Sequence, residues 1–270
     1  MVKNLSFFII LLLFVPKLTF SQISWNHIQA GLWSSEVICH PSAQDSPAVY
    51  FIIRFDPHKF HLLLLSEKEF SDKKRTLSQW GEDFQLLAGT NAGMFAQDYL
   101  SHTGYLKKDG KIYNSQINAQ YGALLVFDPA IEELPFIQIL DRTVDDWEKG
   151  LGQYRSAVQN FRLTGPRGEN LWKEKGDRNS IAAFGIDQED RALFVFCETP
   201  VSVFYFNECL TFLSLKLKRA MYLEGGSYAG LYFKWGKDHW IKSGKTMVSQ
   251  ETGLVGELVI PNILGIEGKE

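Results

Sequence analysis

Three short polar stretches, each beside an apolar run, hold the side chains whose types and spacing suit chemistry. The first is Asn91-Ala92-Gly93-Met94-Phe95. Asn91 offers both a hydrogen-bond donor and an acceptor, and Gly93 lets the backbone approach a ligand closely. A ligand-binding loop has this composition, and so does a turn closed by an asparagine side chain. Taken alone, the stretch leaves both interpretations open.

The second stretch combines amide side chains with a permanent positive charge. Gln159 and Asn160 precede Phe161-Arg162-Leu163, and Arg178 stands just before another apolar run. The guanidinium of Arg178 presents planar donors suited to a phosphate, whereas a single surface arginine is commonly just solvated. We treat Arg178 as a candidate anion-binding residue, with Gln159 and Asn160 as candidate substrate-binding residues.

The third stretch places a carboxylate before two glycines and a hydroxyl, in Glu224-Gly225-Gly226-Ser227. Glycines expose backbone N–H groups to an anionic oxygen, and Glu224 is suited to general acid or base catalysis. A glycine turn beside a solvated glutamate is the plain alternative. The stretch also nearly fits the glycine-x-serine-x-glycine pattern of serine hydrolases, but Ala229 occupies the place of the last glycine. We therefore favour Glu224 over Ser227 as the reactive group.

The sequence contains no recognised metal-binding or nucleotide-binding motif. There is no His-x-x-x-His, no Cys-x-x-Cys and no complete phosphate loop of the form Gly-x-x-x-x-Gly-Lys-Ser/Thr. The sequence predicts no cofactor and no metal site, and a need for a divalent cation cannot be read from it. With 28 Lys and Arg against 31 Asp and Glu, the formal charge of -3 does not favour nucleic acid as a partner.

The elements that must position these side chains are mostly strands. Apolar runs of strand length, bounded by turn residues, cover residues 48–53, 60–65, 86–89, 122–127, 136–140, 181–186, 192–196, 221–223 and 254–260. Asp109-Gly110 predicts a hairpin turn, and residues 187–191 predict a second. Helical spacing of apolar residues is confined to 76–85, 144–153 and 202–217, the last of which should lie on a sheet. These elements predict an α+β fold: a single domain of extended mixed or antiparallel sheet with a few flanking helices.

The N-terminus is typical of a signal peptide rather than of a folded element. Lys3 is followed by an apolar run from Leu5 to Val15, and small residues flank Phe20. A membrane anchor is the alternative, but a span needs about 20 apolar residues. We predict a signal peptide over residues 1–21, a domain over 22–270, a secreted or periplasmic location, and no membrane span after processing.

Three cysteines, Cys39, Cys197 and Cys209, allow at most one internal disulfide. Cys197 ends an apolar run and Cys209 lies in a helical pattern. We therefore expect both of these to be small buried hydrophobic residues.

In their order along the chain, these stretches resemble the phosphodiester glycosidase family. The resemblance covers most of the chain and is carried by residues 25–32, 91–95, 104–110, 159–163, 178–179, 223–227 and 261–262. It implies hydrolysis of the bond between a sugar's anomeric carbon and a phosphodiester. The leaving phosphate is a stable anion, so such a site needs an anion clamp and an activated water more than a strong acid.

The resemblance also implies roles for individual residues. Arg178 would bind phosphate, and Asn91 with the Gly93 backbone would hold sugar or phosphate oxygens. Glu224 would orient or deprotonate water. Gly225 belongs to the same loop, in which Gly226 and Ser227 would supply hydrogen-bond donors.

Two departures from the family pattern leave a second function open. The family usually carries aspartate at the position of Glu224, and a displacement of about 1 Å can reduce a rate hundredfold. The stretch at Gln159-Asn160 also differs from the family's serine-glycine-proline run. The alternative is a non-catalytic exported protein that binds carbohydrate or associates with the envelope. In either case the expected partner is a sugar phosphate or another glycan.

Overall fold

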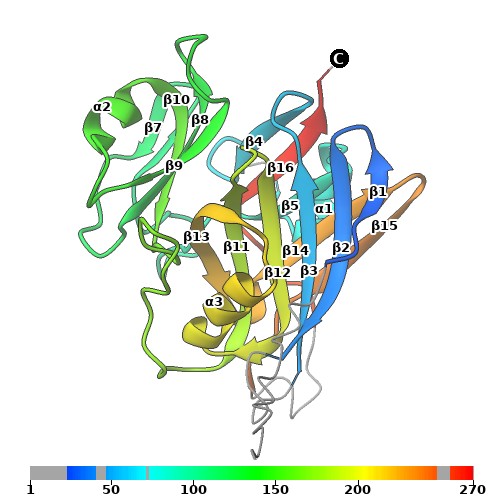
Figure 1. The fold of residues 1–270 in the computed structure, drawn as a ribbon. Coiled ribbons are helices and arrows are strands. Elements are labelled where there is room, and N and C mark those ends of the chain that lie inside the picture. The colour runs from blue at the N-terminus through cyan, green and yellow to red at the C-terminus, as the bar shows by residue number, and fades with distance from the viewer. Residues whose placement is uncertain (1–22, 41–46, 71–72, 248–255, 270) are drawn as a thin grey trace, which may run out of the picture.

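The computed structural model describes residues 23–40, 47–70, 73–247 and 256–269. Within these ranges the chain forms three antiparallel sheets, three α-helices and a short 3-10 helix (Figure 1). The helices are α1 (Leu77–Asp83), α2 (Trp147–Gly152) and α3 (Val203–Phe212), and the 3-10 helix is η1 (Gly226–Tyr228). The strands are β1 (Asn26–Gln29), β2 (Leu32–Cys39), β3 (Ala48–Phe55), β4 (Phe60–Ser66), β5 (Ala88–Asn91), β6 (Leu106–Lys108), β7 (Lys111–Asn114), β8 (Ala123–Pro129), β9 (Ile137–Asp141), β10 (Tyr154–Asn160), β11 (Asn179–Asp187), β12 (Ala192–Val201), β13 (Leu217–Gly225), β14 (Gly230–Trp235), β15 (Asp238–Ser243) and β16 (Asn262–Gly268).

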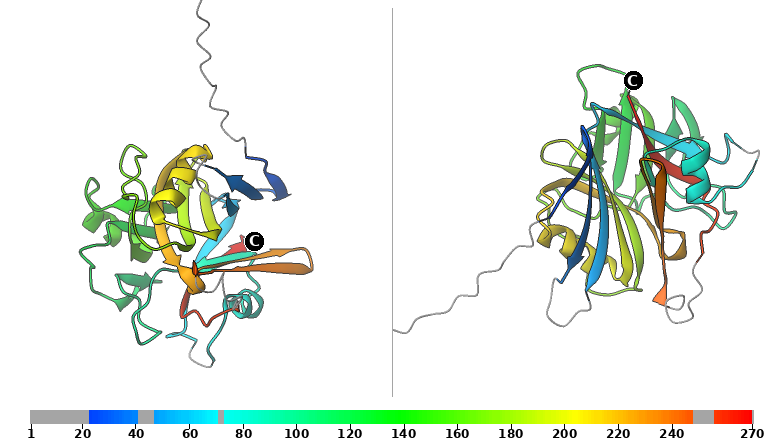
Figure 2. Two further views of the ribbon diagram at one scale, coloured as in Figure 1. Left: turned by 90° about the horizontal axis from the view of Figure 1, so that it is seen from below. Right: turned by 90° about the vertical axis from the view of Figure 1, so that its right-hand side faces the viewer.

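The three sheets form two facing layers and a side unit. The six-stranded sheet has the order β1-β2-β3-β12-β11-β13, and the sheet β15-β14-β5-β16-β4 lies across from it (Figure 2). The third sheet, β7-β6-β10-β8-β9, lies beside β13 with α2 at its outer edge (Figure 1). The side unit thus meets the main sheet along the strand that carries Glu224.

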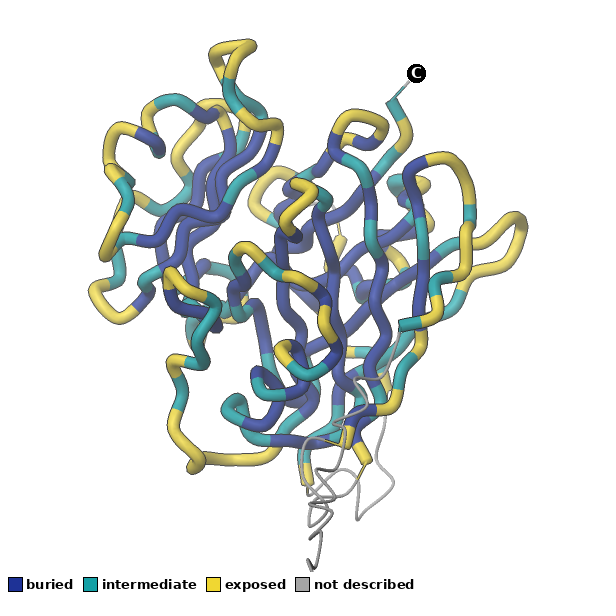
Figure 3. Tube along the Cα trace, in the orientation of Figure 1, coloured by how far each residue is buried: buried dark blue, intermediate teal, exposed yellow. Residues whose placement is uncertain are grey.

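Side chains that alternate between the two faces of a strand contribute to two hydrophobic cores, one on each face of the main sheet. In β11, Ala182, Phe184 and Ile186 join a core shared by all three sheets, whereas Ile181 and Ala183 join a second core beneath α3. Successive strand residues point to opposite faces, so a strand covered on both faces reads as a continuous apolar run. The central strands are accordingly buried over most of their length (Figure 3).

The predicted elements are largely confirmed. Each apolar run from 48–53 to 221–223 overlaps a strand, and both predicted hairpins join neighbouring strands. Every strand pair among the described residues is antiparallel, so the mixed sheet that we left open is not observed. The predicted helix over 202–217 is too long. It ends at Phe212, because Ser214 and Lys216 adopt positive φ and Leu217 already pairs with Asp187 as β13 begins.

The predicted strand over residues 254–260 is wrong for its described part. Residues 256–260 form only an isolated bridge between Val259 and Thr76, and the strand begins later, as β16. Positions 254 and 255 and the predicted signal peptide lie outside the described residues. In the part of the chain that is described, no helix is long and apolar enough to cross a membrane.

One cysteine prediction is wrong and the other is confirmed. Cys209 is not a free hydrophobic residue but is bonded to Cys39, with a Cα–Cα distance of 6.0 Å. The helix α3 lies on the sheet above the end of β2, which brings together two residues 170 positions apart. Cys197 is buried and free, as predicted.

Candidate active site

The strand β13 carries an irregularity immediately before Glu224. Ala182 pairs with Glu224 and Ala183 pairs with Tyr222, so Leu223 is an extra residue on β13. Such β-bulges re-aim the side chains beside them and are frequent near active sites. The carbonyl of Leu223 accepts a hydrogen bond of 2.8 Å from Nδ2 of Asn160. A side chain from the third sheet therefore fixes the bulge.

Both polar atoms of the Asn160 side chain form hydrogen bonds. Its Oδ1 accepts a 2.8 Å hydrogen bond from the backbone N–H of Phe161, and its side chain is fully buried. The structure thus places Asn160 next to the candidate site as a brace for β13. Its direct contact with substrate stays a prediction.

The carboxyl of Glu224 is buried, and few interactions offset its loss of hydration. The residue is 8% exposed, and its Oε1 accepts one hydrogen bond of 2.9 Å from the N–H of Gly225. Burial raises the pKa of Glu224 to about 7, and the hydrogen bond from Gly225 opposes this only in part. A carboxyl that titrates near neutral pH is suited both to donate and to accept a proton.

Aromatic rings lie on one side of Glu224. Tyr222 lies 6.4 Å from Phe161 and 6.4 Å from Trp172, measured between ring centroids. Phe161 in turn contacts Tyr121 edge-on at 4.5 Å. Burial raises the pKa of Tyr222 far above its usual value, and the charge of Glu224 raises it further. The phenol of Tyr222 is therefore a neutral neighbour of the carboxyl.

A second aromatic group lies beyond the glycine loop. Tyr228 contacts Phe95 at 4.9 Å and Tyr99 at 6.2 Å between ring centroids. Burial raises the pKa of Tyr228, with smaller contributions from Tyr99 and Glu224. The charge of Glu224 thus acts on two tyrosines, Tyr222 and Tyr228, and each of these contacts further aromatic rings.

The first polar stretch is held by backbone contacts. Nδ2 of Asn91 donates to the carbonyl of Tyr228 at 2.6 Å, and its Oδ1 accepts from the N–H of Gly230 at 2.9 Å. Asn91 is fully buried. Its amide fastens the chain after η1 to β5, which is the second of the two interpretations that the sequence left open. A contact between Asn91 and substrate stays a prediction.

Position 93 requires a glycine because the His102 side chain lies close to its backbone. Gly93 has a φ of +114°, and a Cβ there would lie 2.6 Å from Nε2 of His102 and 3.2 Å from Nδ2 of Asn160. His102 is buried, and burial lowers its pKa, so the imidazole is neutral. Nδ1 of His102 lies 2.9 Å from the carbonyl of Gly104. Sequence reasoning missed His102, for which the only signal was its place two residues before that glycine.

Gln159 braces the third sheet. Its Oε1 accepts from the N–H groups of Tyr105 and Asn118 at 3.0 and 2.9 Å. Its Nε2 donates to the carbonyls of Asn118 and Tyr121, both at 2.9 Å. These four hydrogen bonds satisfy the amide. The geometry thus gives Gln159 a structural role, and its contact with substrate stays a prediction.

Arg178 lies at the same end of the main sheet as the glycine loop. It immediately precedes β11, and the pairing of Ile181 with Gly225 brings the start of that strand beside Gly226. Its side chain is exposed and makes no hydrogen bond or ion pair with any described residue. Ser227 is half-buried in the same loop. The backbone thus brings Arg178, Glu224 and Ser227 to one end of β13, and the phosphate contact of Arg178 stays a prediction.

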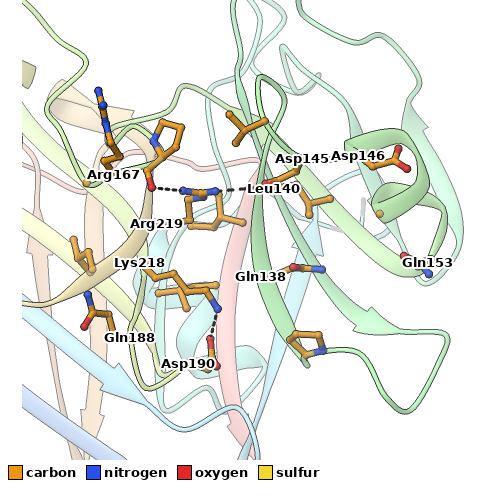
Figure 4. A pocket seen from close by; sticks show the side chains of 18 of the residues that line it. Gln138, Leu140, Asp145, Asp146, Gln153, Arg167, Gln188, Asp190, Lys218 and Arg219 are labelled. Carbon is orange, nitrogen blue, oxygen red and sulfur yellow. Dashed lines mark hydrogen bonds and ion pairs between the residues drawn. The ribbon is translucent and has the colours of Figure 1, made fainter.

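Two clefts flank β13. Phe161 and Trp172, which both contact Tyr222, line a cleft of about 470 Å³. A larger cleft of about 850 Å³ lies at the opposite end of β13 and contains none of the predicted site residues (Figure 4). Across the described ranges, no group of three or more His, Cys, Asp or Glu side chains is placed to hold a metal ion.

The fold and the site define an antiparallel β-protein with a buried carboxyl in front of a glycine loop. The chain belongs to the phosphodiester glycosidase family, whose model matches residues 84–267. The match spans more than half of the chain and includes every predicted site residue. Among curated proteins, none matches this chain.

Solved structures share the fold at low sequence identity. A hypothetical protein from Synechocystis matches with a TM-score of 0.66 and 9% identity, over 92% of this chain and 64% of that one. The zebrafish N-acetylglucosamine-1-phosphodiester alpha-N-acetylglucosaminidase catalytic domain, auto-inhibited by its pro-peptide, matches with a TM-score of 0.64 and 12% identity, over 92% and 87%. A Burkholderia pseudomallei protein named as exported matches with 0.54 and 12%, over 82% and 74%. This chain therefore spans less than two thirds of the Synechocystis protein.

Proposed function

We propose that this protein is an exported hydrolase that cleaves the bond between a sugar's anomeric carbon and a phosphodiester. Membership of the phosphodiester glycosidase family supports the reaction class, and the zebrafish enzyme of similar fold is named for a sugar phosphodiester. The observation that carries the proposal is the buried carboxyl of Glu224, with a pKa of about 7, in front of Gly225 and Gly226. A carboxyl that titrates near neutral pH can lose its proton there and then accept one from water.

The proposed reaction assigns little work to a general acid. The departing phosphate is already a stable anion, so the glycosidic oxygen needs no strong proton donor. Glu224 accepts a proton from the attacking water, which adds to the anomeric carbon as the bond to the phosphate oxygen breaks. The exposed guanidinium of Arg178 supplies positive charge for the phosphate. Asn91, Asn160 and His102 act by positioning the backbone around the carboxyl.

Export is part of the proposal and has its own support. The bond between Cys39 and Cys209 suits an oxidising compartment, since disulfides persist mainly in exported proteins. The apolar run from Leu5 to Val15 predicts the signal peptide that would direct the chain there. Fractionation of cells expressing the full chain tests this, and a protein that stays entirely in the cytoplasm would contradict it.

Nitrophenyl diesters of sugar 1-phosphates test the reaction and the bond that breaks. A glycosidase releases nitrophenyl phosphate, whereas a phosphodiesterase acting on the same compound releases nitrophenol. In ¹⁸O-labelled water, attack at the anomeric carbon places the label in the sugar, and attack at phosphorus places it in the phosphate. A panel of hexose and N-acetylhexosamine diesters in both anomeric forms covers the unknown sugar. Label in the phosphate would overturn the proposal, and binding without turnover would favour the non-catalytic alternative.

A further inference from the structure

The cleft of about 470 Å³ beside Phe161 and Trp172 contains two arginines with different surroundings. Nη1 of Arg162 lies 2.8 and 2.9 Å from the two carboxylate oxygens of Asp141, which is 1% exposed. The charge of Arg162 is thereby compensated inside the protein. This arginine serves as part of the wall.

Arg142 is held in place without a carboxylate partner. Its Nη1 donates to the carbonyls of Asn118 and Tyr121 at 3.1 and 3.0 Å. Its guanidinium lies over the ring of Trp147, 4.8 Å from the centroid. No described Asp or Glu forms an ion pair with it, and its Nε is buried without a hydrogen-bond partner. The cleft therefore carries one uncompensated positive charge in a fixed orientation.

The walls of the cleft connect directly to the candidate active site. The carbonyl of Phe161 accepts a 3.0 Å hydrogen bond from the N–H of Tyr222. The ring centroids of Phe161 and Trp172 both lie 6.4 Å from that of Tyr222. The charge of Glu224 in turn raises the pKa of Tyr222. One aromatic side chain thus links the carboxyl to the cleft.

We propose that this cleft receives the leaving half of the substrate and that Arg142 binds an oxyanion on it. An arginine with free donors is suited to phosphate and carboxylate alike, and Phe161 and Trp172 offer an apolar wall to a sugar ring or another flat group. The anion is either the phosphodiester group itself or a carboxylate carried by the aglycone. The identification of this ligand as substrate rests on the proposed function, but the anion site does not.

Binding of small anions to the intact protein tests the site without any turnover. Dimethyl phosphate is a phosphodiester with no anomeric carbon, glucuronate carries a carboxylate on a sugar, and methyl glucoside is a neutral control. NMR titration of the wild-type protein follows the indole N–H signals, with the Trp172 signal identified by Trp172→Phe. We expect one of the two anions to shift this signal saturably and the neutral sugar to leave it unchanged.

Variants at matched positions locate the binding. Arg142→Gln removes the charge while keeping donors for the two carbonyls, and should weaken anion binding at least tenfold. Arg142→Lys should restore part of that loss. Arg155→Gln is the control, because Arg155 is exposed near the start of β10, at the end away from Phe161. Circular dichroism and thermal midpoints verify that each variant is folded.

The outcomes separate the two proposals. Preference for dimethyl phosphate identifies the cleft as a site for the phosphodiester group, and preference for glucuronate identifies an acidic aglycone. If neither anion binds, or if Arg142→Gln binds as the wild type does, the inference is overturned even where sugar phosphodiesters are hydrolysed. Anion binding without any hydrolysis would instead leave the site in place and remove the proposed reaction.

Discussion

The two ends of β13 deal with charge in opposite ways. At its start, Lys218 pairs with Asp190 at 2.9 Å with both side chains about 60% exposed, at 58% and 61%. Arg219 lies 3.7 Å from Asp145 and donates to a backbone carbonyl in the same open cleft (Figure 4). At its other end, Glu224 is 8% exposed and forms no ion pair with any described residue.

This difference favours the Glu224 end of β13, rather than the larger cleft, as the place of the proposed reaction. Exposed ion pairs are solvated, contribute about 0–1 kcal/mol and leave each group close to its ordinary behaviour. A buried carboxyl without a cation holds its proton until near neutral pH, which is where a group must titrate to transfer protons efficiently. We therefore expect the proposed reaction at the end of β13 that carries Glu224.

Neutralising Glu224 should have the largest effect of any single substitution at either end of β13. We expect Glu224→Gln to reduce kcat/KM for a sugar phosphodiester by roughly 10²–10⁴-fold, because the amide cannot accept the proton. Glu224→Asp keeps the carboxyl and should retain part of the activity. Steady-state rates with both variants make the measurement. A Gln variant with more than a tenth of wild-type activity would remove Glu224 from the reaction.

The pH dependence of stability tests whether this carboxyl is truly buried. Burial raises the pKa of Glu224 from an ordinary 4.5 to about 7, so the folded protein binds this proton more tightly than the unfolded chain. Its contribution to stability is therefore complete below about pH 4.5 and is lost as the pH rises to about 7. The loss amounts to roughly 3 kcal/mol.

Glu224→Gln should abolish this loss, since the amide has no proton to release. Urea unfolding at pH 5 and pH 8 measures it. The variant should gain stability over the wild type on going from pH 5 to pH 8. The control Asp190→Asn changes an exposed carboxylate in the turn between β11 and β12, and it should show no such gain. An equal pH response in wild type and Glu224→Gln would mean that the carboxyl is hydrated.

Two exposed arginines allow the ends of β13 to be compared directly. Arg178 precedes β11 beside the glycine loop, and Arg167 lines the larger cleft with a side chain that is 89% exposed. We expect Arg178→Ala to reduce kcat/KM by about tenfold to a hundredfold, as loss of a charge-assisted hydrogen bond to phosphate would. Arg167→Ala should change it less than twofold. Equal effects would refute the phosphate contact of Arg178.

The smallest effect is expected at the exposed ion pair. Lys218→Gln breaks the ion pair with Asp190. We expect the free energy of unfolding to change by at most about 0.5 kcal/mol. Activity should be unchanged within error. Thermal unfolding and the phosphodiester assay provide the two measurements. A large loss of activity would show that the larger cleft takes part in the reaction.

Secondary structure could be predicted from the sequence where residues close together along the chain decide it. The eight apolar runs from 48–53 to 221–223 became strands because each has strand length and turn residues at its ends. The hairpin at Asp109-Gly110 formed because both residues accept the positive φ that the turn requires. The helix over 202–217 was overextended because strand pairing with β11 claimed its last residues.

Prediction of the candidate site was less complete, for a different reason. Asn91, Gln159 and Asn160 have the side chains of ligand-binding residues, yet each is buried and hydrogen-bonded to the backbone of other segments. Amides serve both purposes, and their type does not say which. Arg142 gave no signal in the sequence, and His102 gave only its place two residues before Gly104, because packing is what makes both residues unusual.

The amino-acid sequence alone determined the strands of the eight apolar runs from 48–53 to 221–223, the two hairpins and the carboxylate before the glycine loop, since these depend on residues close together along the chain. The tertiary structure decided that Cys39 is bonded to Cys209, that Asn160 holds the bulge at Leu223, and that Glu224 retains its proton to about pH 7. Burial and hydrogen-bond partners come from residues far apart in sequence, 170 positions in the case of the disulfide. Reactivity follows from that environment, so it emerges only when the sheets are assembled.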